Sequence, residues 1–566
     1  MLIQQAFALI SLIPGSVLAL TEGGLHPVQL AQASPGNLPQ TLEAPSLTTT
    51  LENFGYWQAL CRLQVEAEKY VEAQAACAAA LQLRPQEPDL WTTQSSLLLA
   101  LAQYPEAIAA AQQALTLNSD NALKALALAH QCRAYLELRQ PDQALDLCQQ
   151  ALKLTESGDE ASLASLWLYQ GRALAQQQDF EAALVAYERA LLFDRQDAQV
   201  LTYRCQAYLD LKQYGNALES CEAALDGNSS WGSASPALAW SLRGMAYREL
   251  GQLVPAVAAF DQALTLNPAD APIWLAQGQA LEALGRSEEA LLSYNRAVAL
   301  QPDWPQARAG QCALLNQTAE YEAALAACEQ ALAGNGDWGA VGAAAAWSQQ
   351  AQAYLGLDQP QAALAAINRA VGLNSEYAAA WNNRGAILAR LENWQGAIAS
   401  LQRATELDPT YASPWINVGR IQRLLGQYEA ALTAYDQAIA LDPNDAETWA
   451  NRSVVQWYLK QHEAALESAD RAIALDERTY LGWYNRATAL VSLERYPEAG
   501  RAYQQAIRIS PDSADAWTGM GVVLSRLNRY DEARQVLAKA LELNPQQGVA
   551  QAAWRALPPL IRPSQQ

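Results

Sequence analysis

The sequence predicts an all-α fold, a solenoid of about 28 antiparallel helices that stack side by side along the chain. Three observations predict it. The chain of 566 residues repeats itself every 34 residues, and a fixed period of this length is typical of stacked supersecondary units. Apolar residues recur at helical spacing twice in every unit. Turn and stop signals separate the two helical stretches and end each unit.

The period is clearest in the alanine residues. Fourteen alanines have another alanine seven residues later: Ala73, Ala107, Ala144, Ala183, Ala217, Ala256, Ala290, Ala324, Ala363, Ala397, Ala431, Ala465, Ala499 and Ala533. Eleven of these have a tryptophan sixteen residues before them: Trp57, Trp91, Trp167, Trp240, Trp274, Trp347, Trp381, Trp415, Trp449, Trp483 and Trp517. Small side chains at fixed places let helices approach closely, and the tryptophans fill the wider gaps between units.

Residues 412–443 show how each helical hairpin is predicted. Trp415 and Gly419 belong to one helical face, and Ala431 and Tyr435 belong to a second. A Gly-Gln-Tyr sequence separates the two stretches, and an Asp-Pro pair ends the second one. Each unit is therefore expected to form two helices joined by a short turn.

The unit resembles the tetratricopeptide repeat, with tryptophan at position 4, glycine at 8, alanine at 20 and 27, an aromatic residue at 24 and proline at 32. The resemblance covers about fourteen repeats, residues 54–547, and departs from the pattern where Leu128, Leu201 and Arg308 replace tryptophan. It implies a right-handed superhelix whose first helices line a concave groove. It also implies a protein that binds other proteins.

The expected elements follow one another simply along the chain. They are a signal peptide (1–19), a flexible linker (20–53), eight repeats with inserted loops (54–343), six uninterrupted repeats (344–547), and a capping helix and tail (548–566). The insertions are residues 122–124, 159–163, 232–236 and 339–343. A terminal cap is expected because the outer face of the last repeat has no neighbour.

The amino-terminal segment resembles a secretory signal peptide. An apolar run, Ala6 to Ile13, precedes Pro14-Gly15 and a small-x-small site ending at Ala19. No lysine or arginine precedes Arg62, so the basic start of such a peptide is missing. Either the true start lies upstream or the segment is an unstructured leader. The apolar run is too short for a membrane span, and none is expected elsewhere.

All eight cysteines fall into four pairs, each sixteen residues apart: Cys61 with Cys77, Cys132 with Cys148, Cys205 with Cys221, and Cys312 with Cys328. Each pair takes repeat positions 8 and 24, which are equidistant from the turn of the hairpin and therefore lie side by side. We expect four disulfides within repeats, and hence an oxidising compartment. Two alternatives stay open: packed core thiols, and metal sites, which have too few ligands for zinc.

The chemistry of the chain argues against several functions. A net charge of −21 is unfavourable for nucleic-acid binding, which needs dense lysine and arginine. The three histidines, His26, His130 and His462, form no metal or catalytic motif. Gly334, Gly336 and Gly339 match a dinucleotide-binding pattern by letter, but they follow a helix instead of a strand. We expect no enzyme, no cofactor and no metal.

The resemblance places groove-facing residues at positions 2, 5, 6, 9, 12 and 13. Position 6 is asparagine in four consecutive repeats: Asn383, Asn417, Asn451 and Asn485. This is similar to the asparagine ladder of superhelical peptide-binding arrays, and a carboxamide can pair with any peptide group. The alternative is that asparagine is simply common at this position of the repeat and binds no ligand. Arg390, Arg420 and Arg423 should lie beside the first rungs and favour acidic segments, and Trp457 and Tyr458 offer an apolar surface.

The same groove position carries His130, Tyr169 and Tyr203 in repeats three to five, where packing against a neighbouring helix is the simpler role. The sequence therefore predicts a non-enzymatic scaffold of bacterial exported type. It would bind extended protein segments outside the cytoplasm, in a periplasm, a thylakoid lumen or the secreted space. The rival is a cytoplasmic redox-responsive regulator with switchable thiol pairs. The sequence leaves the oligomeric state open.

Overall fold

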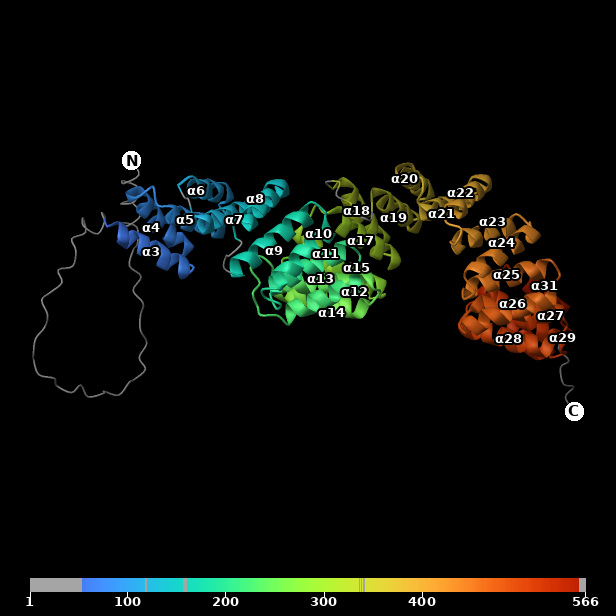
Figure 1. The fold of residues 1–566 in the computed structure, drawn as a ribbon. Helices are drawn as coiled ribbons and strands as arrows, with labels where there is room; N and C mark the ends of the chain where they lie inside the picture. The colour runs from blue at the N-terminus through green and yellow to red at the C-terminus, as the bar shows by residue number, and fades with distance from the viewer. Residues whose placement is uncertain are drawn as a thin grey trace, which may run out of the picture.

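A computed structural model of the chain describes residues 53–117, 120–155, 160–334, 336, 338 and 342–558. The predicted signal peptide and nearly all of the predicted linker lie outside these residues, as does the tail after Pro558. Within them the structure is all-α, as the sequence predicts, and its helices pack as adjacent pairs. Figure 1 shows an elongated array with the first helices, α3 and α4, and the last, α31, at opposite ends.

The helices of the described residues in chain order are α3 (Phe54–Glu66), α4 (Tyr70–Leu83), α5 (Pro88–Ala100), α6 (Tyr104–Leu117), α7 (Asn121–Glu137), α8 (Pro141–Leu154), α9 (Glu160–Gln176), α10 (Phe180–Leu191), α11 (Ala198–Asp210), α12 (Tyr214–Leu225), α13 (Pro236–Glu249), α14 (Leu253–Leu266), α15 (Ala271–Ala283), α16 (Ser287–Leu300), α17 (Pro305–Gln317), α18 (Tyr321–Ala333), α19 (Gly342–Gly356), α20 (Pro360–Leu373), α21 (Ala378–Arg390), α22 (Trp394–Leu407), α23 (Ala412–Leu424), α24 (Tyr428–Leu441), α25 (Ala446–Tyr458), α26 (His462–Leu475), α27 (Tyr480–Ser492), α28 (Tyr496–Ile509), α29 (Ala514–Arg526), α30 (Tyr530–Leu543) and α31 (Gly548–Ala556).

The repeated alanines form the seam of the array. Ala431 and Ala438 of α24, for example, are 0% and 1% exposed, and their equivalents in other second helices are similarly buried. Each odd-numbered helix also packs against the odd-numbered helix of the next pair. The core is therefore a chain of small clusters at successive junctions, and each pair depends mainly on its neighbours.

Tryptophan at position 4 ties six of the first helices to the preceding repeat. The indole Nε1 of Trp449 donates to the carbonyl oxygen of Pro443 at 3.0 Å, which lies at the end of the previous hairpin. Five more tryptophans make the equivalent bond: Trp91, Trp274, Trp381, Trp483 and Trp517. Where arginine replaces tryptophan, Arg308 Nε donates to the Pro302 carbonyl at 2.8 Å. Arginine in place of tryptophan therefore preserves the hydrogen bond to the preceding repeat.

Each hairpin turns through one residue in the left-handed region. Gly426, with φ of 72°, is such a residue, and Arg139 takes the same place between α7 and α8 with φ of 55°. The following amide closes the turn, since Gln427 N donates to the carbonyl oxygen of Gln422 at 2.8 Å. This bond pattern is a common way to end a helix.

The prediction that all insertions are loops is wrong in two places. Residues 122–124 belong to α7 and residues 160–163 belong to α9, so both helices have seventeen residues where other first helices have thirteen to fifteen. Residues 121–124, Asn-Ala-Leu-Lys, include good helix formers, and Asp120 caps the helix by accepting from Leu123 N at 3.3 Å. The insertion at 232–236, by contrast, begins in a loop and ends where α13 starts.

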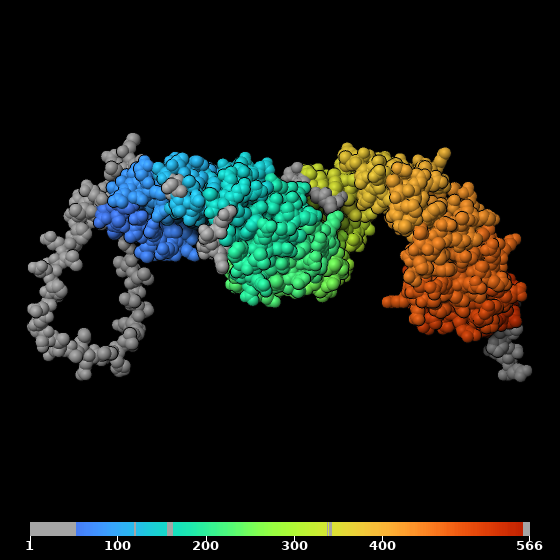
Figure 2. Space-filling view, in the orientation of Figure 1, coloured from blue at the N-terminus to red at the C-terminus, as the bar shows by residue number. Residues whose placement is uncertain are grey.

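The array bends as it runs from one end to the other. In Figure 2 a hollow opens below helices α19–α22, between the central helices and the carboxy-terminal ones. Four consecutive first helices, α21, α23, α25 and α27, lie along this part of the array and carry the asparagines that the sequence analysis selected.

Candidate functional site

The four asparagines at position 6 mostly bond to the preceding repeat. Asn383 Nδ2 donates to Ser348 Oγ at 3.1 Å, and Asn417 Nδ2 donates to Asn382 Oδ1 at 2.9 Å. Asn485 Nδ2 donates to the carbonyl oxygen of Ala450 at 2.8 Å. In each case the partner lies 35 residues earlier, on the neighbouring first helix.

These bonds divide the four residues into two kinds. Asn485 is only 8% exposed, so its carboxamide joins α25 to α27 inside the array. Asn451 is partly buried and makes no side-chain hydrogen bond to any described residue. A buried, bonded amide contributes to stability, whereas an unbonded and partly exposed one is available to a ligand. The sequence pattern alone could not separate these roles.

The three arginines predicted beside the asparagines differ in the same way. Arg390 Nη2 forms an ion pair with Asp358 Oδ1 at 2.6 Å, so its charge is balanced by the preceding hairpin. Arg420 is exposed, and the described residues supply no ion-pair partner for it. Burial raises the pKa of the Tyr435 hydroxyl, and the nearby guanidinium groups of Arg423 and Arg420 oppose that increase. Arg420 is therefore the one arginine of the three that is exposed and has no ion-pair partner among the described residues.

An aromatic pocket of about 250 Å³ lies between α25 and α27. Trp457 and Tyr458 form one wall, as their place in the sequence suggested, and Tyr484, Asn485 and Thr488 line another part. The rings of Trp457 and Tyr458 meet edge to face, with centroids 5.1 Å apart. Trp457 Nε1 donates to Ser492 Oγ at 2.8 Å, which fixes the indole across the two repeats.

Tyr458 extends this surface to the preceding hairpin. Its ring stacks on Tyr428 with centroids 4.6 Å apart and an angle of 2° between the planes, and it remains 47% exposed. Sequence reasoning missed both Tyr428 and Tyr484. Tyr484 occupies position 5, which the resemblance places in the groove, so the repeat pattern could have indicated it. Tyr428 starts a second helix, for which the pattern gives no groove position.

The amino-terminal half carries a second aromatic surface. His130 and Tyr169 line a cavity of about 780 Å³ between α7 and α9. Burial lowers the pKa of His130 to about 4, and the charge of Arg133 adds to the decrease. Tyr203 lies under the guanidinium of Arg172, 4.9 Å from ring centroid to Cζ, and shares a hydrogen bond of 2.9 Å with Ser233 Oγ. The inserted segment 232–236 therefore contacts α9 and α11 through Ser233.

In each of the four cysteine pairs the sulfur atoms lie within bonding distance. The S–S distances are 2.00, 2.09, 2.09 and 2.03 Å in chain order, and the Cα–Cα distances are 4.8 to 5.5 Å. All eight cysteines are 0% exposed. Each pair joins the two helices of one hairpin at positions 8 and 24, the places expected from the spacing.

Two further features bear on chemistry. Among the described residues no three histidine, cysteine, aspartate or glutamate side chains gather where they could hold a metal ion. No helix in this part of the chain has the length and apolar character needed to cross a membrane.

Family models match the chain along most of its described length. A model described as "Tetratricopeptide repeat" matches residues 131–200, 204–271, 241–307, 348–412 and 484–548, which together make up more than half of the chain. A "TPR repeat" model matches residues 419–460, and another tetratricopeptide repeat model matches 446–479.

Similar curated proteins share only a short region. Hsp70-Hsp90 organizing protein 1 of Glycine max is 30% identical over 103 residues, and that of Arabidopsis thaliana is 31% identical over 101 residues. The match covers 17% of this chain and 18% of each relative, so the chain spans less than a fifth of their length.

Solved structures with similar arrays have low sequence identity to this chain. The Cut9-Hcn1 hetero-tetramer of APC/C is 16% identical, with 90% of this chain and 97% of that chain covered and a TM-score of 0.42. Naa15/Naa10 bound to HypK-THB is 15% identical, with 88% and 95% covered and a TM-score of 0.34. YrrB, a TPR protein with an unusual peptide-binding site, is 22% identical, with 33% and 97% covered and a TM-score of 0.30.

Proposed function

Since the chain belongs to the tetratricopeptide repeat family, we propose that it is a non-enzymatic protein–protein interaction scaffold that holds extended segments of its partners on the concave face of the array. The fourteen hairpins supply a long surface, and no catalytic arrangement of side chains is needed for this role. The partner segments would bind along α21, α23, α25 and α27.

The observation that carries this proposal is the aromatic surface of Tyr428, Trp457, Tyr458 and Tyr484. Much of the array is built from alanine, whereas here four partly exposed rings lie together. The unbonded Asn451 lies on α25 one helical turn before Val454, which lines the pocket. Tyrosine and tryptophan are enriched at protein interfaces because their rings bury much apolar area while their polar atoms remain paired. An apolar side chain of the partner would fill the pocket, and Asn451 would pair with the partner backbone.

We infer that acidic segments are among the partners. Arg420 is exposed on the first helix before this pocket and lacks a balancing carboxylate among the described residues. A carboxylate on the partner would form a charge-assisted hydrogen bond with it. Arg390, already paired with Asp358, would contribute less.

We also propose that the scaffold works outside the cytoplasm, with its four cysteine pairs oxidised. Such bonds persist in oxidising compartments, and a periplasm, a thylakoid lumen or the secreted space fits equally. The rival redox-switch function is disfavoured by burial. Exchange requires a thiolate to reach a sulfur atom, and all eight cysteines are 0% exposed. Mapping peptides from the native protein without reduction tests this: four intact pairs support export, and eight free thiols in native extract support the rival.

Partner capture tests the binding surface. The mature array, made in an oxidising compartment, would be used to recover bound proteins, and the recovered set would be compared with that of a Trp457→Ala/Tyr458→Ala variant. We expect the variant to lose most of the captured proteins, because truncating central aromatic residues typically costs more than 1 kcal/mol each. A Phe193→Ala variant removes a 37% exposed ring just after the end of α10, away from this surface, and serves as control. Equal capture by all three proteins contradicts the proposal.

A further inference from the structure

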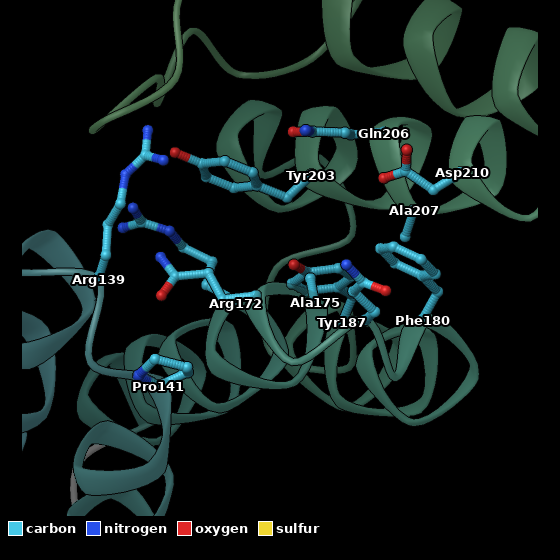
Figure 3. A pocket seen from close by; sticks show the side chains of 12 residues that line it. Arg139, Pro141, Arg172, Ala175, Phe180, Tyr187, Tyr203, Gln206, Ala207 and Asp210 are labelled. Atoms are coloured by element: carbon cyan, nitrogen blue, oxygen red, sulfur yellow. The ribbon is translucent and has the colours of Figure 1, made fainter.

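A second pocket lies on the amino-terminal half, where the turn after α7 meets α9, α10 and α11. Its cavity of about 600 Å³ is within the range typical of ligand sites. Figure 3 shows its lining from close by, with Arg139 at one end and Asp210 at the other. Tyr203, which the sequence analysis placed at a groove position, lines it, but none of the asparagines and arginines selected for peptide binding does.

The two ends of this pocket carry opposite charges that are not balanced by the chain itself. Arg139 occupies the left-handed turn position, with φ of 55°, and Asp210 is the last residue of α11. In the part of the chain that the structure describes, neither side chain has an ion-pair partner, and they do not pair with each other. Burial raises the pKa of the Asp210 carboxyl, so a cation bound beside it would favour its ionised form.

A third charge, Arg172, is fixed in the wall near Arg139. Its Nη2 donates to Glu137 Oε1 at 3.0 Å, and its Nη1 donates to Ser233 Oγ at 3.2 Å. Its guanidinium also lies over the Tyr203 ring. Because Glu137 balances Arg172, the net positive charge at this end comes from Arg139.

Rings occupy the space between the two charged ends. Figure 3 shows Phe180 and Tyr187 on one side and Tyr203 on the other. Tyr187 is 1% exposed and is packed over Gly171, where an added Cβ would lie 2.4 Å from its Cε1, so it forms a rigid base. The apolar part of a peptide would pack against these rings while its charged groups reach the ends.

We propose that this pocket binds a short protein segment that carries one acidic and one basic side chain, the acidic one at Arg139 and the basic one at Asp210. The inference rests on the proposed scaffold function and adds to it a second recognition surface with a defined charge requirement. Selectivity arises because a like-charged segment would meet one repulsive end. Ser233 bonds to both Arg172 and Tyr203 and so fixes this part of the wall.

Fluorescence anisotropy with labelled alanine–serine peptides tests the proposal. The peptides carry glutamate and lysine, two glutamates or two lysines, separated by up to four neutral residues. We expect the wild-type protein to bind the mixed peptide about fivefold more tightly than the like-charged ones, the effect of one exposed ion pair at its upper limit. Asp210→Lys should then prefer the two-glutamate peptide, and Arg139→Glu should prefer the two-lysine peptide.

The general acidity of the protein favours lysine peptides everywhere, so the change in preference between variants is the decisive readout. Glu406→Lys alters the net charge as Asp210→Lys does, but it lies on α22 beside Arg403, and it should leave the wild-type order unchanged. The same order of preference in all variants overturns the proposal, as does the absence of saturable binding by every peptide. Either result leaves the carboxy-terminal surface untouched, because that surface is assayed by Trp457 and Tyr458 variants.

Discussion

The ring of Tyr435 covers Gly419, and a Cβ added to that glycine would lie 2.8 Å from Tyr435 Cε1. The two residues are sixteen apart and occupy positions 8 and 24 of their repeat. Equivalent pairs occur elsewhere with the same contact: Gly171 with Tyr187, Gly244 with Phe260, Gly278 with Tyr294, Gly385 with Leu401, and Gly521 with Leu537. The cysteine pairs use these same two positions. In ten of the fourteen hairpins, this contact is therefore filled either by a large side chain over glycine or by two joined sulfur atoms. In the other four, serine or alanine stands at position 8 in place of glycine or cysteine.

Gly419→Ala should destabilise the array by about 1–3 kcal/mol, because the added methyl group overlaps the Tyr435 ring in a packed core. The matched control is Gly372→Ala in α20, where an added Cβ meets nothing within 4 Å. That change should stabilise the helix by about 0.5–1 kcal/mol, since alanine is the better helix former. Urea unfolding followed by circular dichroism measures both. Equal effects at the two positions would show that the Tyr435 contact is unimportant.

A cysteine pair should be replaceable by a glycine at position 8 and a large side chain at position 24. Cys312→Gly/Cys328→Leu copies the Gly385–Leu401 pair, whereas Cys312→Ala/Cys328→Ala leaves the space unfilled. Both lose the disulfide contribution, about 3 kcal/mol for a loop of this length. The glycine–leucine variant should recover about 1.5–3 kcal/mol through burial of the leucine. Thermal unfolding under oxidising conditions ranks the wild type and the two variants. If the alanine variant is at least as stable as the glycine–leucine one, a large side chain over glycine does not replace the cysteine pair.

The helical pairs and their seams were predictable because they depend on contacts that recur at a fixed spacing. Local helix geometry determines the contacts within one hairpin. The alanines at positions 20 and 27 and the sixteen-residue spacing of the cysteines indicate such contacts. The pocket between Arg139 and Asp210 depends on how four helices of three repeats are arranged, and no spacing in the sequence encodes that. The helical insertion at 122–124 was missed because the family pattern was given more weight than local helix propensity.

Replacing the bonded Asn485 and the unbonded Asn451 should affect different properties, stability for the first and partner capture for the second. Asn485→Ala removes a buried side-chain hydrogen bond to the Ala450 carbonyl and should cost about 1 kcal/mol of stability, the usual contribution of one hydrogen bond. Asn451→Ala should change stability by less than about 0.5 kcal/mol, as surface changes commonly do, and should weaken partner capture instead. Unfolding and capture measured on both variants check this. A large loss of stability on changing Asn451 would mean that its role is structural too.

Arg308 should be exchangeable with tryptophan. Both side chains donate a hydrogen bond to the carbonyl oxygen at the end of the previous hairpin, Arg308 at 2.8 Å and Trp274 at 2.9 Å. We expect Arg308→Trp to retain stability and Arg308→Leu to lose about 1 kcal/mol, the usual contribution of one hydrogen bond. Trp274→Phe, which keeps an aromatic ring but removes the donor, should lose a similar amount. Unfolding midpoints of the three variants decide whether the bond or the aromatic ring matters at this position.

Acid should weaken the amino-terminal half through His130. Burial holds the pKa of its imidazole near 4, below the ordinary value of 6.5. Between these two values the unfolded chain binds more protons than the folded one, so the contribution of neutral His130 is complete above pH 6.5 and is lost as the pH falls toward 4. At pH 5 the loss is up to about 2 kcal/mol. Histidine NMR should place the titration of His130 near pH 4, and His130→Gln should flatten the decrease in unfolding midpoint between pH 7 and pH 5. His462→Gln, at the start of α26, is the control and should leave the decrease unchanged; a titration of His130 near 6.5 would contradict the assignment.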